Sequence, residues 1–194
     1  MHGLINKSLQ CFLRDTYGAG AWTEVAQAAD VDPAGFEAML LYDDALTGDV
    51  LAAAAAYLGK SADCVLEDLG TYLVSHPNLE PVRRLLRFGG ATFVDFLHSL
   101  DEMPDRARLA VPQLDLPRLE LLPIDEASYR LDCEWHLPGF EHVLVGLMRT
   151  MADDYGSLVL LECLPPSAGL AHVCIRLIDN GFASGRSFEL AAGS

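Results

Sequence analysis

The chain is short of positive charge. Only 13 lysines and arginines stand against 28 aspartates and glutamates among 194 residues, which gives a formal net charge of −15. The field of such a surface repels phosphate groups, so the composition argues against binding to nucleic acid and to anionic membrane surfaces. Long apolar runs are missing as well. The run over 50–58 is nine residues rich in alanine, against the 18 or more that a membrane span needs, so we expect no membrane association.

Signals for export and for disulfide staples are absent too. The five cysteines are odd in number and spread without clustering, which favours reduced thiols and a cytoplasmic location. The first ten residues, MHGLINKSLQ, lack a basic segment followed by a long apolar core, so we expect no signal peptide. A chain of this length can bury roughly 70% of its unfolded surface, so its core needs neither a disulfide nor a metal staple.

Motifs for catalysis are absent. The chain has no glycine-rich phosphate loop, GxSxG elbow or HExxH sequence. A zinc site could be drawn from Cys133, His136, His172 and Cys174, but residues 133 and 136 would point to opposite faces of a strand. A thiol enzyme using Cys163 or Cys133 with a nearby histidine has no family signature to support it. We therefore predict that the chain is not an enzyme and holds no protein-bound metal ion.

Helical spacing of apolar residues fills the first half of the chain. Thr47, Ser61 and Asn78 are each expected to cap a helix, and Gly89-Gly90 to end the last of these. The second half changes period. Side chains alternate between apolar and polar over 129–136, which predicts a strand with one buried face, followed by a helix over 140–155.

Two further strands are expected at 157–163 and 171–179, joined by a turn at Pro165-Pro166-Ser167. Helices followed by strands with one inserted helix indicate an α+β fold. The final residues, rich in glycine, serine and alanine, are predicted to form a loose tail over 183–194.

The stretch 93–119 joins the two halves. It begins as an amphipathic helix whose buried stripe is predicted to run from Phe93 to Met103, with Ser99 among the residues facing water, and then meets Pro104. A proline in a helix interior costs roughly 3 kcal/mol. Either the helix kinks at Pro104, or one helix ends and another begins there with Pro104 in its first turn.

Short features recur along nearly the whole chain in a characteristic order and spacing. These are Met1-x-Gly3, Tyr17-Gly18, Trp22, Tyr42-Asp43-Asp44, Gly70, Phe96-Leu97, Leu100-Asp101, Pro112, Pro117, Gly139, Gly146 and Tyr155-Gly156. By their order and spacing the chain resembles the haem nitric oxide/oxygen binding family, H-NOX, the sensor domain of soluble guanylate cyclases and of bacterial signalling proteins.

The resemblance implies one domain over 1–182. It divides into an N-terminal helical subdomain, 1–60, and a C-terminal subdomain, 61–182, with helices on a small antiparallel sheet. It also implies a haem pocket, from which this chain departs. The family's iron-ligating histidine falls on Pro104, counted back from Pro112 and Pro117, and proline offers no ligating atom.

A Tyr-x-Ser-x-Arg motif that holds the haem propionates in the family falls here on Cys133, Trp135 and Leu137. The arginine fork that such carboxylates need is thus replaced by an apolar side chain. Val143 stands about where some oxygen-binding members carry a distal tyrosine. Ile5 and Pro117 match positions that press on the haem in relatives, and they would be ordinary packing residues without it.

Our first hypothesis is a regulatory sensor module that is haem-independent. It would bind an apolar ligand or act on a signalling partner such as a histidine kinase or a cyclic-di-GMP enzyme. An apolar pocket between the halves would be lined by Leu97, Leu100, Trp135, Leu144 and Leu147. A collapsed, filled pocket in a pure interaction domain is equally allowed. The alternative is a nitric oxide sensor that holds haem b through an unusual axial ligand, His98 or His136.

Overall fold

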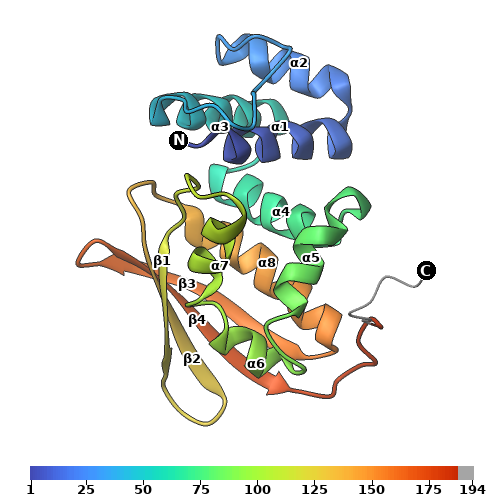
Figure 1. The fold of residues 1–194 in the computed structure, drawn as a ribbon, viewed down its shortest axis with the longest axis vertical. Helices are drawn as coiled ribbons and strands as arrows, with labels where there is room; N and C mark the ends of the chain where they lie inside the picture. The colour runs from blue at the N-terminus through green and yellow to red at the C-terminus, as the bar shows by residue number, and fades with distance from the viewer. Residues whose placement is uncertain (188–194) are drawn as a thin grey trace.

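The computed structural model describes residues 1–187. Over these residues the chain forms eight α-helices, one short 3-10 helix and a four-stranded antiparallel sheet (Figure 1), which confirms the α+β class. The helices are α1 (Gly3–Tyr17), α2 (Ala19–Ala28), α3 (Asp44–Leu58), α4 (Ala62–Ser75), η1 (Pro77–Leu79), α5 (Glu80–Arg87), α6 (Phe93–His98), α7 (Met103–Ala110) and α8 (Phe140–Tyr155). The strands are β1 (Arg118–Pro123), β2 (Ser128–Glu134), β3 (Leu158–Ser167) and β4 (Leu170–Asp179).

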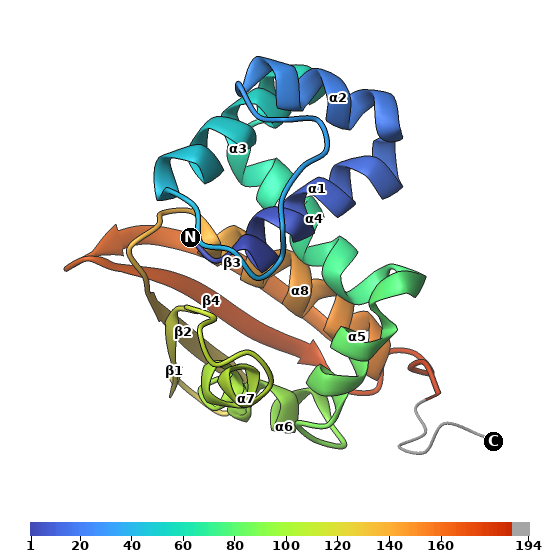
Figure 2. The ribbon, with the colours of Figure 1, turned by 45° about the horizontal axis from the view of Figure 1, so that its top comes forward.

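Helices α1, α2 and α3 form a layer of their own above α4, as Figures 1 and 2 show from two directions. Their apolar faces meet in one core that also takes in the upper face of α4. Side chains pin the long loop between α2 and α3: the Trp22 indole N–H donates to the Pro33 carbonyl at 2.8 Å, and Gln10 accepts from the Phe36 N–H at 3.0 Å. Helices α1 to α3 thus share one core with α4.

Helix α4 crosses α8 at the boundary between that layer and the rest of the molecule. Two glycines allow their backbones to touch. A Cβ atom on Gly70 would lie 2.1 Å from the Val143 carbonyl oxygen, and one on Gly146 would lie 2.0 Å from the Glu67 carbonyl oxygen. Only glycine fits at both positions, so the two helices form a rigid cross that joins the subdomains.

The sheet has the order β1-β2-β4-β3, with every neighbouring pair antiparallel. Helices α6 and α8 cover one face, and the buried residues of β2 and β4 pack against them. The predicted strand over 129–136 is present but ends at Glu134, which leaves Trp135 and His136 in the following loop. Strand β1 was not predicted, because its burial does not alternate cleanly.

The β3–β4 hairpin corrects one prediction. The expected turn at Pro165-Pro166-Ser167 is wrong, since both prolines lie inside β3, and the chain turns at Ala168 and Gly169, which have positive φ angles. Strand β3 is an edge strand, where a proline removes no hydrogen bond that the sheet requires.

Two predicted helix starts are also wrong. Helix α3 begins three residues before Thr47, because the Asp43 carboxylate accepts the Ala45 N–H at 2.9 Å and caps it first. Asn78 lies inside η1 and does not cap α5. The Ser61 cap is confirmed, since its hydroxyl accepts the Cys64 N–H.

A buried ion pair fastens α5 to the end of α8. Arg83 donates two hydrogen bonds to Asp154, at 2.9 and 3.1 Å, and the Arg87 guanidinium lies 3.8 Å from the centre of the Tyr155 ring. Backbone N–H groups of Ala183 and Arg186 donate to Gly156 and Asp154, so the first part of the predicted loose tail is bonded to α8. The rest of that prediction, 188–194, lies outside the described residues.

No helix within residues 1–187 is long and apolar enough to cross a membrane.

Candidate functional site

The site suggested by the sequence centres on α6 and α7. Thr92 and Asp95 form a reciprocal capping box that starts α6, and the hydrogen bonds from Thr92 hold the pKa of the Asp95 carboxyl below its ordinary value. Phe93, Phe96 and Leu97 form the buried face of this helix. The predicted continuous helix to Met103 is wrong, because α6 ends at His98.

Pro104 occupies the second position of α7. The first-turn N–H groups of a helix have no partner within the helix, so a proline there removes no hydrogen bond, and its fixed φ suits the helix start. Of the two alternatives for this proline, a new helix is therefore confirmed and a kink is wrong. The Pro104 ring is buried, and Arg106 donates to the Ser99 carbonyl at 2.8 Å, which ties α7 to the end of α6.

Ser99 itself is buried, not facing water as predicted. Its hydroxyl donates to the Phe96 carbonyl at 2.8 Å, so the polar group is satisfied inside the last turn.

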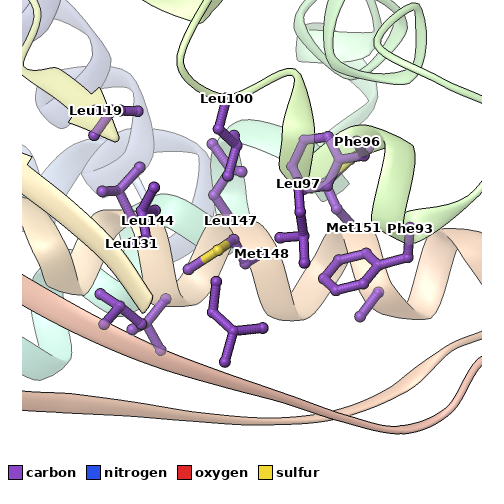
Figure 3. Packing of buried hydrophobic residues seen from close by; sticks show 14 of the residues in the cluster. Phe93, Phe96, Leu97, Leu100, Leu119, Leu131, Leu144, Leu147, Met148 and Met151 are labelled. Atoms are coloured by element: carbon purple, nitrogen blue, oxygen red, sulfur yellow. The ribbon is translucent and has the colours of Figure 1, made fainter. Parts of the chain in front are cut away.

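Four of the five predicted pocket residues do meet. Leu97, Leu100, Leu144 and Leu147 belong to one buried cluster, which we call the sheet core, between α6, α8 and the sheet (Figure 3). Met148 and Leu131 fill the space between them, and both are completely buried. The fifth, Trp135, lies outside: its half-buried ring packs edge-on against Phe140 at 4.9 Å, and its N–H donates to Asp115 at 3.3 Å.

The other positions that the resemblance pointed to do not converge on the sheet core as a set. Cys133 is part of it, and burial raises the pKa of its thiol to about 12, so it stays protonated. Val143 faces the opposite way, into the N-terminal core. Leu137 is half-buried in the loop after β2, and Ile5 is half-buried on α1. Pro117 is buried just before β1.

Neither candidate histidine points into the sheet core. His98 is exposed and lies edge-on to the Tyr129 ring at 5.9 Å, beside a polar hollow of about 340 Å³. His136 is 45% exposed and lies between two carboxylates, 3.1 Å from Asp44 and 3.4 Å from Asp115. It bridges α3 to the loop before β1, across the boundary between the subdomains.

The cysteine and metal alternatives can also be placed. Cys163 lies 3.7 Å from the His142 ring, but burial raises the pKa of its thiol to about 11, which is the opposite of an activated nucleophile. Among residues 1–187, no three histidine, cysteine, aspartate or glutamate side chains are arranged to hold a metal ion. Of the imagined zinc ligands, His172 instead bonds to Asp132 and Ser167.

Comparison with known proteins decides the family. The family model described as haem-NO-binding, HNOB, matches residues 2–163. The chain belongs to this haem-NO-binding family. The resemblance found in the sequence is thus confirmed.

Among curated proteins, soluble guanylate cyclase 89Db of Drosophila melanogaster is 27% identical over 158 residues, covering 81% of this chain and 24% of that protein. Soluble guanylate cyclase gcy-31 of Caenorhabditis elegans is 25% identical over 183 residues, covering 93% of this chain and 26% of that protein. The chain therefore spans about a quarter of the length of these relatives.

Solved structures show the same fold. The Fe(II) unliganded H-NOX protein from K. algicida gives a TM-score of 0.79 at 15% identity, covering 93% of this chain and 98% of that one. The I5F mutant of the T. Tengcongensis H-NOX gives 0.76 at 17% identity, covering 93% and 99%. At these identities the likeness establishes the fold alone.

The side chains of this family member do not fit haem held in the family's way. The position that the resemblance assigns to the iron ligand is the buried Pro104 ring, and the position assigned to the arginine is Leu137. Pockets for drug-sized ligands enclose roughly 300–1,000 Å³ with mostly apolar walls, whereas the space beneath α6 is occupied by Met148 and its leucine neighbours. Surface hollows lie beside His98 and on the outer face of the sheet, and charged side chains are among the lining residues of both.

Two polar contacts in the fold were not predicted from the sequence. The buried Arg83–Asp154 pair joins residues 71 positions apart. The hydrogen-bonded set of Asp132, His172 and Ser167 combines two strands and a hairpin end. Only the antiparallel register, in which Asp132 pairs with His172, brings the second set together.

Proposed function

We propose that this chain is a sensor or regulatory module of the haem-NO-binding family that works without haem and acts through a signalling partner. The observation that carries the proposal is Pro104, buried in the first turn of α7 where the resemblance places the iron ligand. A ring without a lone pair cannot anchor iron. The hydrogen bond from Arg106 to the Ser99 carbonyl fixes its helix to α6.

The packing of the sheet core favours a protein partner, not a small ligand, as the signal to which the module responds. Leu97, Leu144 and Met148 are completely buried against one another and leave a filled interior. Opening room for an apolar ligand would separate these contacts, each of which contributes to stability. The filled-pocket form of our first hypothesis is therefore the one that we adopt.

The contact between α4 and α8 can transmit a structural change from one subdomain to the other. Because Gly70 and Gly146 bring two helix backbones into contact, a shift of α8 against the sheet must move α4 as well. Helix α4 also contributes to the core of the N-terminal layer. A partner bound to either subdomain would thereby bias the other.

We further propose that the partner is a signalling enzyme, such as a histidine kinase or a cyclic-di-GMP enzyme. The curated relatives support this class, since the matching segment is about a quarter of a guanylate cyclase in each. The reduced state of all five cysteines is consistent with a cytoplasmic location.

Native mass spectrometry of the freshly purified chain tests the proposal. We expect the mass of the polypeptide alone. A stoichiometric complex with haem would contradict haem-independence, and a retained apolar molecule would contradict the filled core. A haem complex that disappears in His98→Ala or His136→Ala would establish the alternative, in which one of these side chains moves inward to ligate iron.

A further inference from the structure

The outer face of the sheet, away from α6 and α8, carries a hydrogen-bonded set that the proposed sensor function does not use. The Ser167 hydroxyl lies 2.8 Å from His172 Nε2, and His172 Nδ1 lies 2.7 Å from Asp132 Oδ1. Asp132 and His172 are each only 8% exposed, while Ser167 is exposed at the end of β3. Asp132 and His172 are thus shielded from solvent, whereas residue Ser167 is accessible.

The proton positions in this set follow from Asp132. Burial alone would raise the pKa of its carboxyl, but hydrogen bonds from Arg130, at 2.8 and 3.2 Å, and from His172 outweigh burial and lower the pKa. An ionised carboxylate can only accept, so His172 must carry its proton on Nδ1. In the neutral ring Nε2 then holds a lone pair, and the Ser167 hydroxyl must donate to it. The serine proton is therefore already directed at a base.

Two backbone N–H donors directly follow Ser167 in the chain. Ala168 and Gly169 form the turn after Ser167 with φ angles of 52° and 81°, and within the described part of the chain neither N–H has a hydrogen-bond acceptor. Adjacent N–H groups of this kind can stabilise a negative oxygen. A surface hollow of about 120 Å³ lies on the Asp132 side of the set, and Asp132 and Leu170 are among its lining residues.

We propose that Ser167, His172 and Asp132 form an acyl-transfer site on the outer face of the sheet, which takes small activated carboxylic esters. This arrangement satisfies the geometric requirements of a nucleophile, a general base and an orienting carboxylate. The site is separate from the sheet core, so it does not depend on whether the chain binds haem.

The reaction would run in two balanced halves. Ser167 Oγ attacks the ester carbonyl carbon while its proton passes to His172 Nε2, and the turn N–H groups donate to the oxyanion. The C–O bond to the alcohol then breaks, and the leaving oxygen takes the proton from Nε2. Water next attacks the acyl-serine and gives a proton to Nε2, the C–Oγ bond breaks, and the proton returns to Oγ as the carboxylic acid leaves.

Carboxylates dominate the charge of the hollow next to Asp132. Glu120 and Glu134 line it together with Asp132, against a single arginine, Arg118, at its wall. Carboxylates repel an anionic substrate, so the site favours neutral or cationic esters.

The test combines covalent labelling with turnover of the full chain. A fluorophosphonate probe should give one adduct, mapped by peptide mass spectrometry to Ser167, and p-nitrophenyl acetate should show a burst of one p-nitrophenol per chain. Ser167→Ala should abolish both signals in a chain that circular dichroism shows to be folded. Ser75→Ala, which alters another exposed serine, should leave both intact.

His172→Gln should slow labelling of Ser167 by at least about 100-fold, the usual contribution of a general base. The proposal fails if Ser167 is not labelled, if Ser75 is labelled equally, or if the rate is unchanged in His172→Gln. Any of these results would mean that the three hydrogen-bonded residues only stabilise the end of the β3–β4 hairpin. Because Ser167→Ala also removes the hydrogen bond to His172, circular dichroism must first show that this variant is folded.

Discussion

A single methyl group at the α4–α8 crossing tests whether the two subdomains are joined as the structure shows. In Gly146→Ala the new Cβ would lie 2.0 Å from the Glu67 carbonyl oxygen, where ordinary contacts begin at 3.4 Å. The helices must then separate by roughly 1 Å or more, which forfeits about half of the dispersion energy between touching atoms.

The magnitude follows from two opposed effects. Overpacking of this kind costs about 3 kcal/mol, at the upper end of its usual range, because the obstacle is helix backbone that cannot rotate away. Replacing a helical glycine by alanine returns about 0.5–1 kcal/mol. The free energy of unfolding should therefore fall by about 2 kcal/mol, and the thermal midpoint by about 4–8 °C for a chain of this size.

Gly48→Ala is the matched control. Gly48 also lies within a helix, α3, but a Cβ there meets nothing within 4 Å. This variant should gain about 0.5–1 kcal/mol from helix propensity alone. Urea unfolding followed by circular dichroism measures both. If Gly146→Ala is as stable as Gly48→Ala, the close backbone contact between α4 and α8 is refuted.

Three further predictions concern packing and charge. Met148→Ala should lower the free energy of unfolding by about 2–5 kcal/mol, because it leaves a cavity in the sheet core. Leu160→Ala, at a side chain that is 57% exposed, should change it by less than about 0.5 kcal/mol. Equal effects of the two changes in urea unfolding would contradict a filled core. Arg83→Met should lower the free energy of unfolding by about 3 kcal/mol, because it leaves Asp154 buried without its main partner. An unchanged urea midpoint would show that Asp154 is already solvated. The lowered pKa of Asp132 means that its ionised form stabilises the fold above its unfolded pKa of about 3.9 and that this contribution is lost as pH falls through the lower folded pKa. Thermal midpoints of the unaltered chain and of Asp132→Asn should thus differ above pH about 4 and converge in stronger acid; a constant difference would contradict the assignment.

Sequence reasoning succeeded where local signals and spacing agree. The apolar stripe of α8 and its stop at Gly156 were readable directly, and so was the Ser61 cap of α4. The family followed from the order of short features, none of which is specific alone. The glycines Gly70 and Gly146 were among them, and the structure supplies their physical reason, which is helix-to-helix backbone contact.

It failed where a tertiary contact competes with a local pattern. The stripe after Phe93 continues at helical spacing, yet the chain leaves the helix at His98 and restarts at Met103. Pro165 was read as a turn residue because its neighbours in the sheet are unknown from sequence, and an edge strand tolerates it. Strand alternation over 129–136 places Trp135 in the pocket, but β2 ends one residue earlier and the ring packs elsewhere. The hydrogen bond between Asp132 and His172 depends on strand register, which no single segment encodes.

The structure also changes how Pro104 is understood. As a first-turn residue, Pro104 does not distort α7. Replacing it by another residue would therefore not relieve any strain in the helix. Exchanging it for histidine would restore one ligating atom but would leave Leu137 in place of the arginine and the sheet core filled. We therefore expect Pro104→His to take up haem no better than weakly.

Titration of the purified chain with haemin, followed by absorption spectroscopy, tests haem-independence most directly. The unaltered chain should show only the broad spectrum of free or loosely associated haemin, without a sharp Soret band that saturates at one equivalent. A sharp Soret band saturating at one haem per chain, and lost in His98→Ala or His136→Ala, would contradict the account.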